Sequence, residues 1–312
     1  MSGNKPVAIV IGASRGIGRQ VAIDLARAGY AVVVAAKTES DASKCKPFPP
    51  NPNSSASTIN TVAREITELH NGTALPVAVD VRSYENIQAM VATTVKKYGR
   101  IDVVVYNSGA IWWSSVEKTP MKRFQLMQRV NPEGLYGTVQ AVLPEMYRNG
   151  GKGKGRIVVI SPPIYSRFFK GKTAYSMGKV GMSVLTMGLA VDFEREGRED
   201  MAITSLWPAA AIESAATQSG DGVEDLRKDL RTPDIFSDAI LSMIKAPAKD
   251  VSGKTFLDED YLRDHDGVRD FSKYALISGS TPRRIMPLKL PDLTVAEQDD
   301  EGVRMESSKA RL

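Results

Sequence analysis

Short apolar runs alternate with amphipathic segments along most of the chain. The runs are rich in β-branched residues and have the length of strands; they are Val7–Ile11, Ala31–Ala35, Leu75–Val79, Ile101–Tyr106, Arg156–Ile160, Ala202–Leu206 and Lys254–Leu257. Between them, apolar residues recur at helical spacing, as in Ile17, Val21 and Leu25. Strands that are apolar on both faces and alternate with helices predict an α/β fold. We expect a doubly wound sheet of about seven parallel strands, with helices on both faces.

Two stretches depart from this alternation. Residues Thr38–Thr58 contain four prolines and many serines, which predicts an elongated loop between the second strand and its helix. From about Tyr261 the periodicity stops, so we expect an irregular tail that packs as an extended arm or is partly disordered. The predicted organisation is one cofactor-binding domain over residues 1–260 and an extended C-terminal tail over residues 261–312.

Composition excludes several classes of protein. Apolar residues make up 42% and charged residues 25% of the chain, which is ordinary for a globular protein. Cys45 is the one cysteine, so neither an intrachain disulfide nor a thiolate zinc cluster can form. With two histidines, His70 and His265, a histidine-rich metal site is also excluded. We expect no metal, and a reducing compartment.

The net charge of +5 does not by itself indicate a nucleic-acid partner. The 41 basic residues are interleaved with 36 acidic ones, and no basic run forms a dedicated patch. The longest apolar runs are strand-sized, so we expect no membrane span. Arg15 interrupts the first apolar region, which argues against a signal peptide.

A glycine-rich turn follows the first predicted strand and precedes an amphipathic helix. Its spacing is G-x-x-x-G-x-G, and glycines here allow backbone N–H groups at a helix start to approach a pyrophosphate. This context favours a Rossmann-type dinucleotide site over a plain loop. The candidate cofactor-binding residues of the turn are Gly12, Ser14, Arg15, Gly16, Ile17 and Gly18.

The end of the second predicted strand indicates which dinucleotide binds. An acid at this place holds the ribose hydroxyls of NAD, but the sequence reads Ala35-Ala36-Lys37. Lys37 and Arg15 match a 2′-phosphate, because cations form charge-assisted hydrogen bonds with it. We therefore expect NADP(H); the alternative is that both residues are solvated surface charges.

Tyr175 and Lys179 are the candidate acid–base pair. A spacing of four places the phenol and the ammonium on one helical face. Lowering a tyrosine pKa from about 10 to about 7 requires about 4 kcal/mol, and a cation at about 4 Å supplies that much at an effective dielectric constant near 20. We expect Lys179 and an oxidised nicotinamide to make Tyr175 a general acid and base. A tyrosine and a lysine at this spacing are common, and without further context a packing role, with the ring against the aliphatic part of the lysine, explains them better than catalysis.

Two further residues give this pair a catalytic context. Ser161 ends a predicted strand, where a hydroxyl at the carboxyl edge of the sheet would face the ligand crevice. Asn131 precedes Pro132 inside a helical stretch. Because proline lacks an N–H, we expect a kink with free carbonyls that can hold an ordered water.

Together these residues resemble the short-chain dehydrogenase/reductase superfamily over residues 1 to about 260. The order of the glycine turn, Asp80-Val81, the Tyr106–Gly109 element, Asn131, Ser161, Tyr175 and Lys179 carries the resemblance. It implies that Asp80 and Val81 border the adenine and that Asn107 braces the adjoining strand. Gly109, Pro208 and Ile212 complete the implied cofactor site.

The resemblance also implies catalytic roles. Asn131 would hold a proton-relay water, Ser161 would polarise the substrate carbonyl and Tyr175 would donate the proton. Lys179 would bind the ribose and lower the tyrosine pKa. Ile11, Tyr106 and Pro208-Ala209 depart from the family pattern. The departures change no reacting group but put the geometry of the cofactor loops in doubt.

Several stretches resemble a peroxisomal group of the family whose substrate is linked to lipid metabolism. Apolar side chains that follow the later strands either line a pocket for a lipid-like ketone or belong to the core; they are Trp112, Trp113, Tyr165, Phe168, Phe169, Trp207 and Ile212. Gly178, Gly181 and Gly188 lie in one predicted helix, which commonly builds a dimer interface in this family. We expect a homodimer or homotetramer.

The predicted function is an NADP(H)-dependent oxidoreductase that reduces a ketone or aldehyde, or oxidises the alcohol, of an apolar substrate. One alternative is an enoyl-CoA-type reductase, which the intact Tyr175–Lys179 pair argues against. The other is a nucleotide-binding scaffold without turnover.

The last three residues, Ala310-Arg311-Leu312, form a near variant of a peroxisomal targeting signal. A receptor must grip the free carboxylate, so the segment has to be exposed. We expect a peroxisomal location with the import receptor as a partner, and a cytoplasmic location if the match is coincidental.

Overall fold

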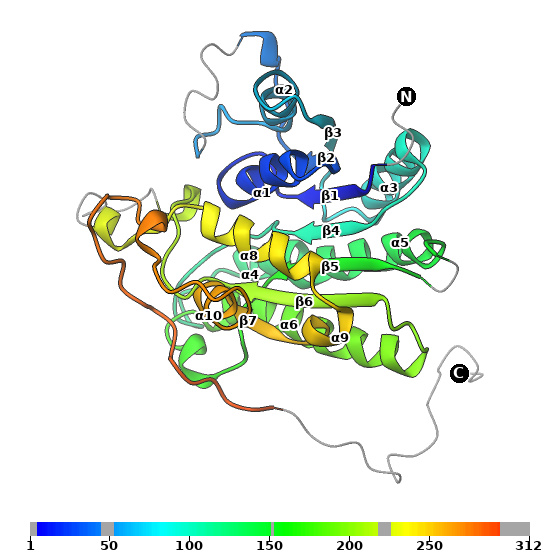
Figure 1. Ribbon diagram of the computed structural model, residues 1–312. Coiled ribbons are helices and arrows are strands. Elements are labelled where there is room, and N and C mark those ends of the chain that lie inside the picture. The colour runs from blue at the N-terminus through cyan, green and yellow to red at the C-terminus, as the bar shows by residue number, and fades with distance from the viewer. Residues whose placement is uncertain (1–4, 45–52, 151–152, 218–225, 294–312) are drawn as a thin grey trace.

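A seven-stranded parallel sheet forms the centre of the computed structural model, which describes residues 5–44, 53–150, 153–217 and 226–293 (Figure 1). The strand order is β3-β2-β1-β4-β5-β6-β7. The strands are β1 (Val7–Ile11), β2 (Ala31–Ala36), β3 (Thr73–Ala78), β4 (Val103–Tyr106), β5 (Gly155–Ile160), β6 (Met201–Trp207) and β7 (Thr255–Leu257). The doubly wound α/β prediction is confirmed, and each predicted strand matches to within two residues at either end.

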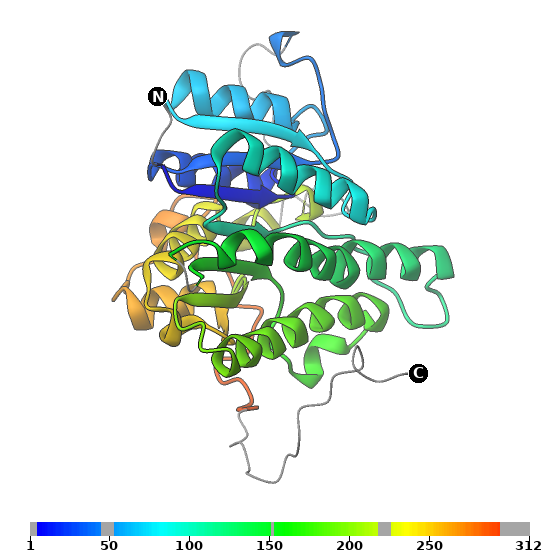
Figure 2. The same cartoon turned by 90° about the vertical axis from the view of Figure 1, so that its right-hand side faces the viewer.

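Helices cover both faces of the sheet (Figures 1 and 2). One core cluster joins the sheet to the helices α1 (Gly16–Arg27), α2 (Ile59–Leu69), α8 (Asp234–Lys245), α9 (Ala248–Val251) and α10 (Asp258–His265). The other joins it to α3 (Tyr84–Tyr98), α5 (Gly134–Tyr147) and α6 (Thr173–Arg195). Strands buried on both faces need this double cover, which is why their sequences are almost continuously apolar.

The order of the strands locates a ligand crevice. The chain moves outward from β1 to β2 and β3, and then returns to place β4 on the other side of β1. Such a reversal opens a crevice beyond the carboxyl ends of the strands. The loops that follow β1 and β4 meet there: the Asn107 amide donates to the carbonyl of Gly12 at 3.1 Å.

The Thr38–Thr58 segment joins β2 to α2, as expected, and the described part of it reaches back to the glycine turn. The Ser57 hydroxyl donates to the carbonyl of Ser14 at 2.7 Å. Thr58 then caps α2 by accepting a hydrogen bond from the Thr61 N–H. The loop therefore supports the cofactor turn from outside, while Cys45 lies outside the described residues.

The C-terminal region begins later than expected, and its described part has one of the two expected forms, an extended arm packed on the domain. The boundary at residue 260 falls inside α10, so the sheet domain continues beyond it. Residues 266–293 pack against the domain, with Tyr274 and Met286 buried. These contacts are made one residue at a time and leave no periodic pattern that a sequence reading could detect. Residues 294–312, with the terminal tripeptide, lie outside the described residues.

No helix among the described residues is both long and apolar enough to span a bilayer.

Candidate active site

One cavity gathers most of the predicted site residues at the carboxyl ends of the strands. Its volume is about 740 Å³. The predicted residues that line it are Gly12, Ser14, Arg15, Gly16, Ile17, Lys37, Asp80, Val81, Asn107, Gly109, Tyr175, Lys179, Pro208 and Ile212. Three predicted residues do not line it: Gly18, Asn131 and Ser161.

The glycine turn forms a cradle of backbone at the start of α1. Gly12 and Gly16 have φ angles of +84° and +55°, which side-chain-bearing residues rarely adopt. A Cβ atom at Gly12 would stand 2.8 Å from the Ser108 nitrogen, and one at Gly18 would collide with the Gly12 carbonyl. Gly18 therefore makes the turn possible without facing the cavity. The first turn of α1 has no acidic residue, so its N–H groups fit a pyrophosphate.

The charged residues at the cofactor end of the cavity include one carboxylate, Asp80, whose ion pairs were not predicted from the sequence. Asp80 contacts Arg82 at 2.5 Å and Lys37 at 3.3 Å. The hydrogen bond from the Arg82 side chain holds the pKa of Asp80 well below its usual range. Arg82 also lines the cavity, so three cations, Arg15, Lys37 and Arg82, and one carboxylate line this end of it. This donor set fits a phosphorylated ribose.

Tyr175 and Lys179 lie on the first two turns of α6 and are both buried at the cavity wall. The Lys179 ammonium donates to the Ile160 carbonyl at 2.8 Å. Burial lowers the pKa of Lys179 to about 7 and raises the pKa of Tyr175 above its usual range. The expected lowering of the tyrosine pKa is therefore not a property of the chain alone, because burial of the phenol raises that pKa.

Ser161 departs from its expected place. It does not line the cavity, although the preceding residue, Ile160, does. The Ser161 hydroxyl is fully buried, 2.8 Å from the Ser205 hydroxyl and 3.0 Å from that of Ser183. Ser205 uses its single proton on the Ser161 carbonyl at 2.5 Å. Ser161 is therefore the donor to Ser205, and no proton remains for a substrate.

Asn131 acts on the cavity through the loop after β4. Its side-chain oxygen accepts from the Ala110 N–H at 2.8 Å, and its amide donates to the Ala110 carbonyl at 3.1 Å. Ala110 lines the cavity, whereas Asn131 is fully buried behind it. The asparagine therefore fixes the shape of the cavity wall.

The expected kink at Pro132 is a π-helical turn, Arg129–Glu133, between α4 (Met121–Gln128) and α5. Within it the Gly134 N–H bonds to the Arg129 carbonyl, five residues back. The Tyr106 hydroxyl donates to the Val130 carbonyl at 2.6 Å. The tyrosine that departs from the family pattern thus supplies the partner that the π turn needs.

The other end of the cavity is aromatic. Trp113, Tyr165, Phe168 and Trp207 line it, while Trp112 and Phe169 do not. The rings of Trp113 and Phe168 each lie 6.3 Å from the ring of Tyr175. Large apolar rings around the phenol suit an apolar substrate.

Several residues that line the cavity were not predicted from the sequence, among them Arg82, Lys172, Ile285 and Met286. Arg82 follows directly after Asp80-Val81, so its place was a readable signal. Lys172 lies three residues before Tyr175, so its place near the cavity could also have been predicted from the sequence. Ile285 and Met286 come from the C-terminal region, where no pattern pointed to the cavity.

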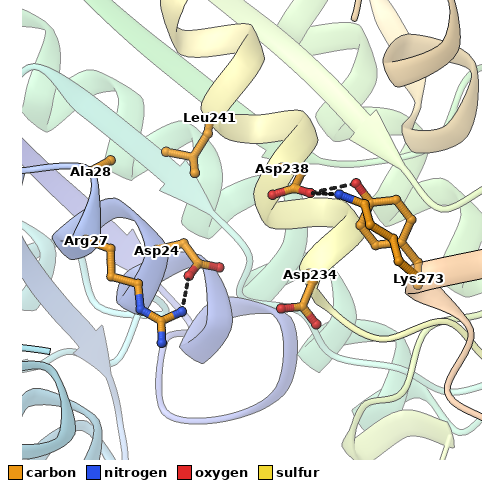
Figure 3. Close-up of a pocket in the computed structure, with 8 residues that line it drawn as sticks. Asp24, Arg27, Ala28, Asp234, Asp238, Leu241 and Lys273 are labelled. Atoms are coloured by element: carbon orange, nitrogen blue, oxygen red, sulfur yellow. Dashed lines mark hydrogen bonds and ion pairs between the residues drawn. The ribbon is translucent and has the colours of Figure 1, made fainter. Parts of the chain in front are cut away.

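A second cavity, of about 550 Å³, lies between the C-terminal end of α1 and α8 (Figure 3). Asp24 pairs there with Arg27, and Asp238 accepts hydrogen bonds from Lys273 and the Tyr274 hydroxyl. Its charges largely neutralise one another, and none of the predicted catalytic residues lines it. No group of metal-ligating side chains occurs in the described parts of the chain.

Comparisons with known proteins agree with this geometry. Residues 6–48 and 52–219 match the family model of short chain dehydrogenases. The chain is 37% identical over 295 residues to hydroxysteroid dehydrogenase-like protein 2 of Mus musculus; the match covers 93% of this chain and 54% of the mouse protein. The chain therefore spans about half the length of that relative.

Solved structures show the same fold. A putative dehydrogenase from Xanthomonas campestris is 33% identical with a TM-score of 0.74, covering 95% of this chain and all of the other. A 7 alpha-hydroxysteroid dehydrogenase, complexed with NADH and 7-oxo glycochenodeoxycholic acid, is 26% identical with a TM-score of 0.63 over 81% of this chain and 92% of the other.

Proposed function

Because this chain belongs to the short-chain dehydrogenase family, whose members are nicotinamide-dependent oxidoreductases, we propose that it interconverts a carbonyl compound and its alcohol with NADP(H). The observation that carries the proposal is the pairing of Tyr175 and Lys179 at the wall of a cavity that also contains the glycine cradle. The apolar rings around the phenol favour an apolar, lipid-like substrate.

Tyr175 is the proton donor in this proposal. Its raised pKa keeps the phenol protonated at neutral pH, which is the form needed to protonate a carbonyl oxygen during reduction. The nicotinamide, when bound, supplies or accepts the hydride. Lys179 is held toward the cavity by the Ile160 carbonyl, and Gly109 leaves space beside it, since a Cβ there would lie 3.4 Å from the ammonium. In this proposal the Lys179 ammonium stabilises the tyrosinate that Tyr175 becomes after it has donated its proton.

The test is cofactor consumption with a panel of ketones and aldehydes. We expect NADPH oxidation that depends on the carbonyl compound and gives the matching alcohol. A nucleotide-binding scaffold is the second candidate, favoured by the turning of Ser161 away from the cavity. NADPH binding without alcohol formation across the panel would support the scaffold.

The proposed preference for NADP(H) rests on the cations Arg15, Lys37 and Arg82. We expect tighter binding of NADPH than of NADH, with most of the preference lost in Lys37→Asp. Lys37 is mostly exposed and pairs weakly with Asp80, so the substitution should leave folding unaffected. Equal affinity of the unmodified protein for both cofactors in a titration would refute the preference.

We also propose self-association through α6. Met177, Val184 and Val191 are exposed at a spacing of seven residues and therefore share one face. A Cβ at Gly188, on the same helix, would meet nothing within 4 Å, whereas Gly181 packs near Pro132 of the same chain. Val184→Lys should shift the sedimentation coefficient toward that of a monomer if this face forms a homodimer or homotetramer.

A peroxisomal address remains a proposal that rests on Ala310-Arg311-Leu312. The intact chain should concentrate in peroxisomes of cultured cells, and a chain lacking these three residues should be diffuse. A diffuse distribution of both chains would refute the address.

A further inference from the structure

Lys172 is a half-buried cation at the aromatic end of the cavity. Its ammonium lies 4.2 Å from the centroid of the Phe168 ring and 5.7 Å from that of Trp113. Both rings pack beside Tyr175. The ammonium and the phenol therefore have two aromatic neighbours in common.

This ammonium has no carboxylate partner among the described residues. Within the described residues its neighbours are the two aromatic rings, and no charged group is paired with it. Burial lowers the pKa of Lys172. Asp80 is the one carboxylate among the described residues that line the cavity, and it is paired with Lys37 and Arg82 at the cofactor end. A partly desolvated cation without a counter-charge attracts an anion more strongly than a cation in open water does.

We propose that Lys172 selects substrates whose apolar body carries an anionic group, such as a carboxylate, close to the reacting carbonyl. The inference rests on the proposed oxidoreductase function and adds the chemical class of its substrate. The rings of Trp113 and Phe168 hold the apolar body, Tyr175 faces the carbonyl and Lys172 faces the carboxylate. Lys172 determines specificity and takes no part in proton transfer.

A matched pair of probes tests this arrangement. 4-Oxo-4-phenylbutanoate has an aromatic body, a ketone and a carboxylate, and its methyl ester lacks only the charge. We expect the unmodified protein to favour the acid over the ester by about tenfold or more in kcat/KM, the scale of one charge-assisted contact. In Lys172→Gln the two values should converge through a higher KM for the acid, and Lys172→Arg should retain the preference.

Lys170→Gln is the matched control. It removes the same charge two residues away from an exposed side chain that does not line the cavity. The preference for the acid should survive in this variant. Equal kcat/KM for acid and ester in the unmodified protein, or an unchanged ratio in Lys172→Gln, overturns the inference.

Equilibrium binding separates this inference from the proposed function. Quenching of tryptophan fluorescence, measured in the presence of NADP⁺, reports binding next to Trp113 without turnover. If neither probe is reduced, the oxidoreductase proposal fails for this substrate class, and binding still decides the role of Lys172. Weaker binding of the acid in Lys172→Gln, with unchanged binding of the ester, supports it, and equal binding overturns it.

Discussion

Two buried polar clusters meet at the end of β5, one residue apart in sequence, and both include a residue of α6. At Ile160 the carbonyl accepts from Lys179, which faces the cavity together with Tyr175. At Ser161 the hydroxyl joins Ser183 and Ser205 in a closed network that does not reach the cavity. Both clusters are excluded from bulk water, but they satisfy their polar groups very differently.

The two clusters differ in whether their polar groups have hydrogen-bond partners within the protein. In the serine cluster every hydroxyl has a partner, so the cluster gains stability and has no proton to give. In the cavity pair, burial favours the neutral forms of both groups, which near neutral pH costs stability only at the lysine, and both side chains line the cavity. Because the tyrosine–lysine pair lines the cavity and the serine cluster does not, we expect a chemical role for the pair and a structural role for the serines.

Tyr175→Phe should give the largest effect. Turnover should fall by about a hundredfold or more, the usual scale for an acid–base group, because the variant has no phenolic proton but retains the ring. NADPH affinity should change little. Tyr165→Phe, which removes another hydroxyl at the cavity wall, is the control and should keep most of the activity. Steady-state rates of the two variants, measured side by side, decide whether the phenol is the donor.

Lys179→Met tests the cost of the buried ammonium through its dependence on pH. The pKa of Lys179 is about 7 in the folded chain and about 10.4 when unfolded, so the unfolded chain binds the extra proton between these values. The free energy of unfolding of the unmodified protein should therefore gain on that of the variant from pH 7 to 9, by up to about 1.4 kcal/mol per pH unit. Urea denaturation at several pH values measures this, and parallel curves would contradict it.

Ser161→Ala should affect stability far more than activity. The loss of its hydrogen bond to Ser205 should lower the free energy of unfolding by about 1–2 kcal/mol. Turnover should stay within about threefold, well short of the effect of losing an acid–base group. A loss of turnover comparable to that of Tyr175→Phe would show that the hydroxyl reaches the substrate and would break the distinction between the clusters.

The smallest expected effect is the coupling within the serine cluster. Ser161→Ala and Ser205→Ala should be non-additive in a double-mutant cycle, with a coupling free energy of about 0.5–1.5 kcal/mol. Tyr175→Phe, combined with Ser161→Ala, should be additive in the free energy of unfolding, because the two side chains share no hydrogen bond in the structure. A coupling free energy between Tyr175→Phe and Ser161→Ala would show that the two clusters are energetically linked.

Local patterns predicted the fold and the cofactor end of the cavity. Strand and helix periodicities, the spacing of Gly12, Gly16 and Gly18, and the four-residue interval from Tyr175 to Lys179 are properties of neighbouring residues. Such features can be read directly, because backbone geometry converts sequence spacing into position. The same reasoning placed Lys37 near the ribose but could not show its contact with Asp80, which lies on a different strand end.

The sequence by itself determined a doubly wound parallel sheet, a glycine-rich turn at the start of the first helix and a tyrosine–lysine pair on one helical face. Only the tertiary structure decided that Ser161 points into the core, that Lys172 has no counter-charge among the described residues and that Met286 closes the aromatic end. Each of these depends on partners distant along the chain: the Tyr165 hydroxyl meets the Met286 sulfur across 121 residues. The direction of a side chain and the pairing of a charge are set by whichever segments pack against them, and that packing is not encoded in local spacing.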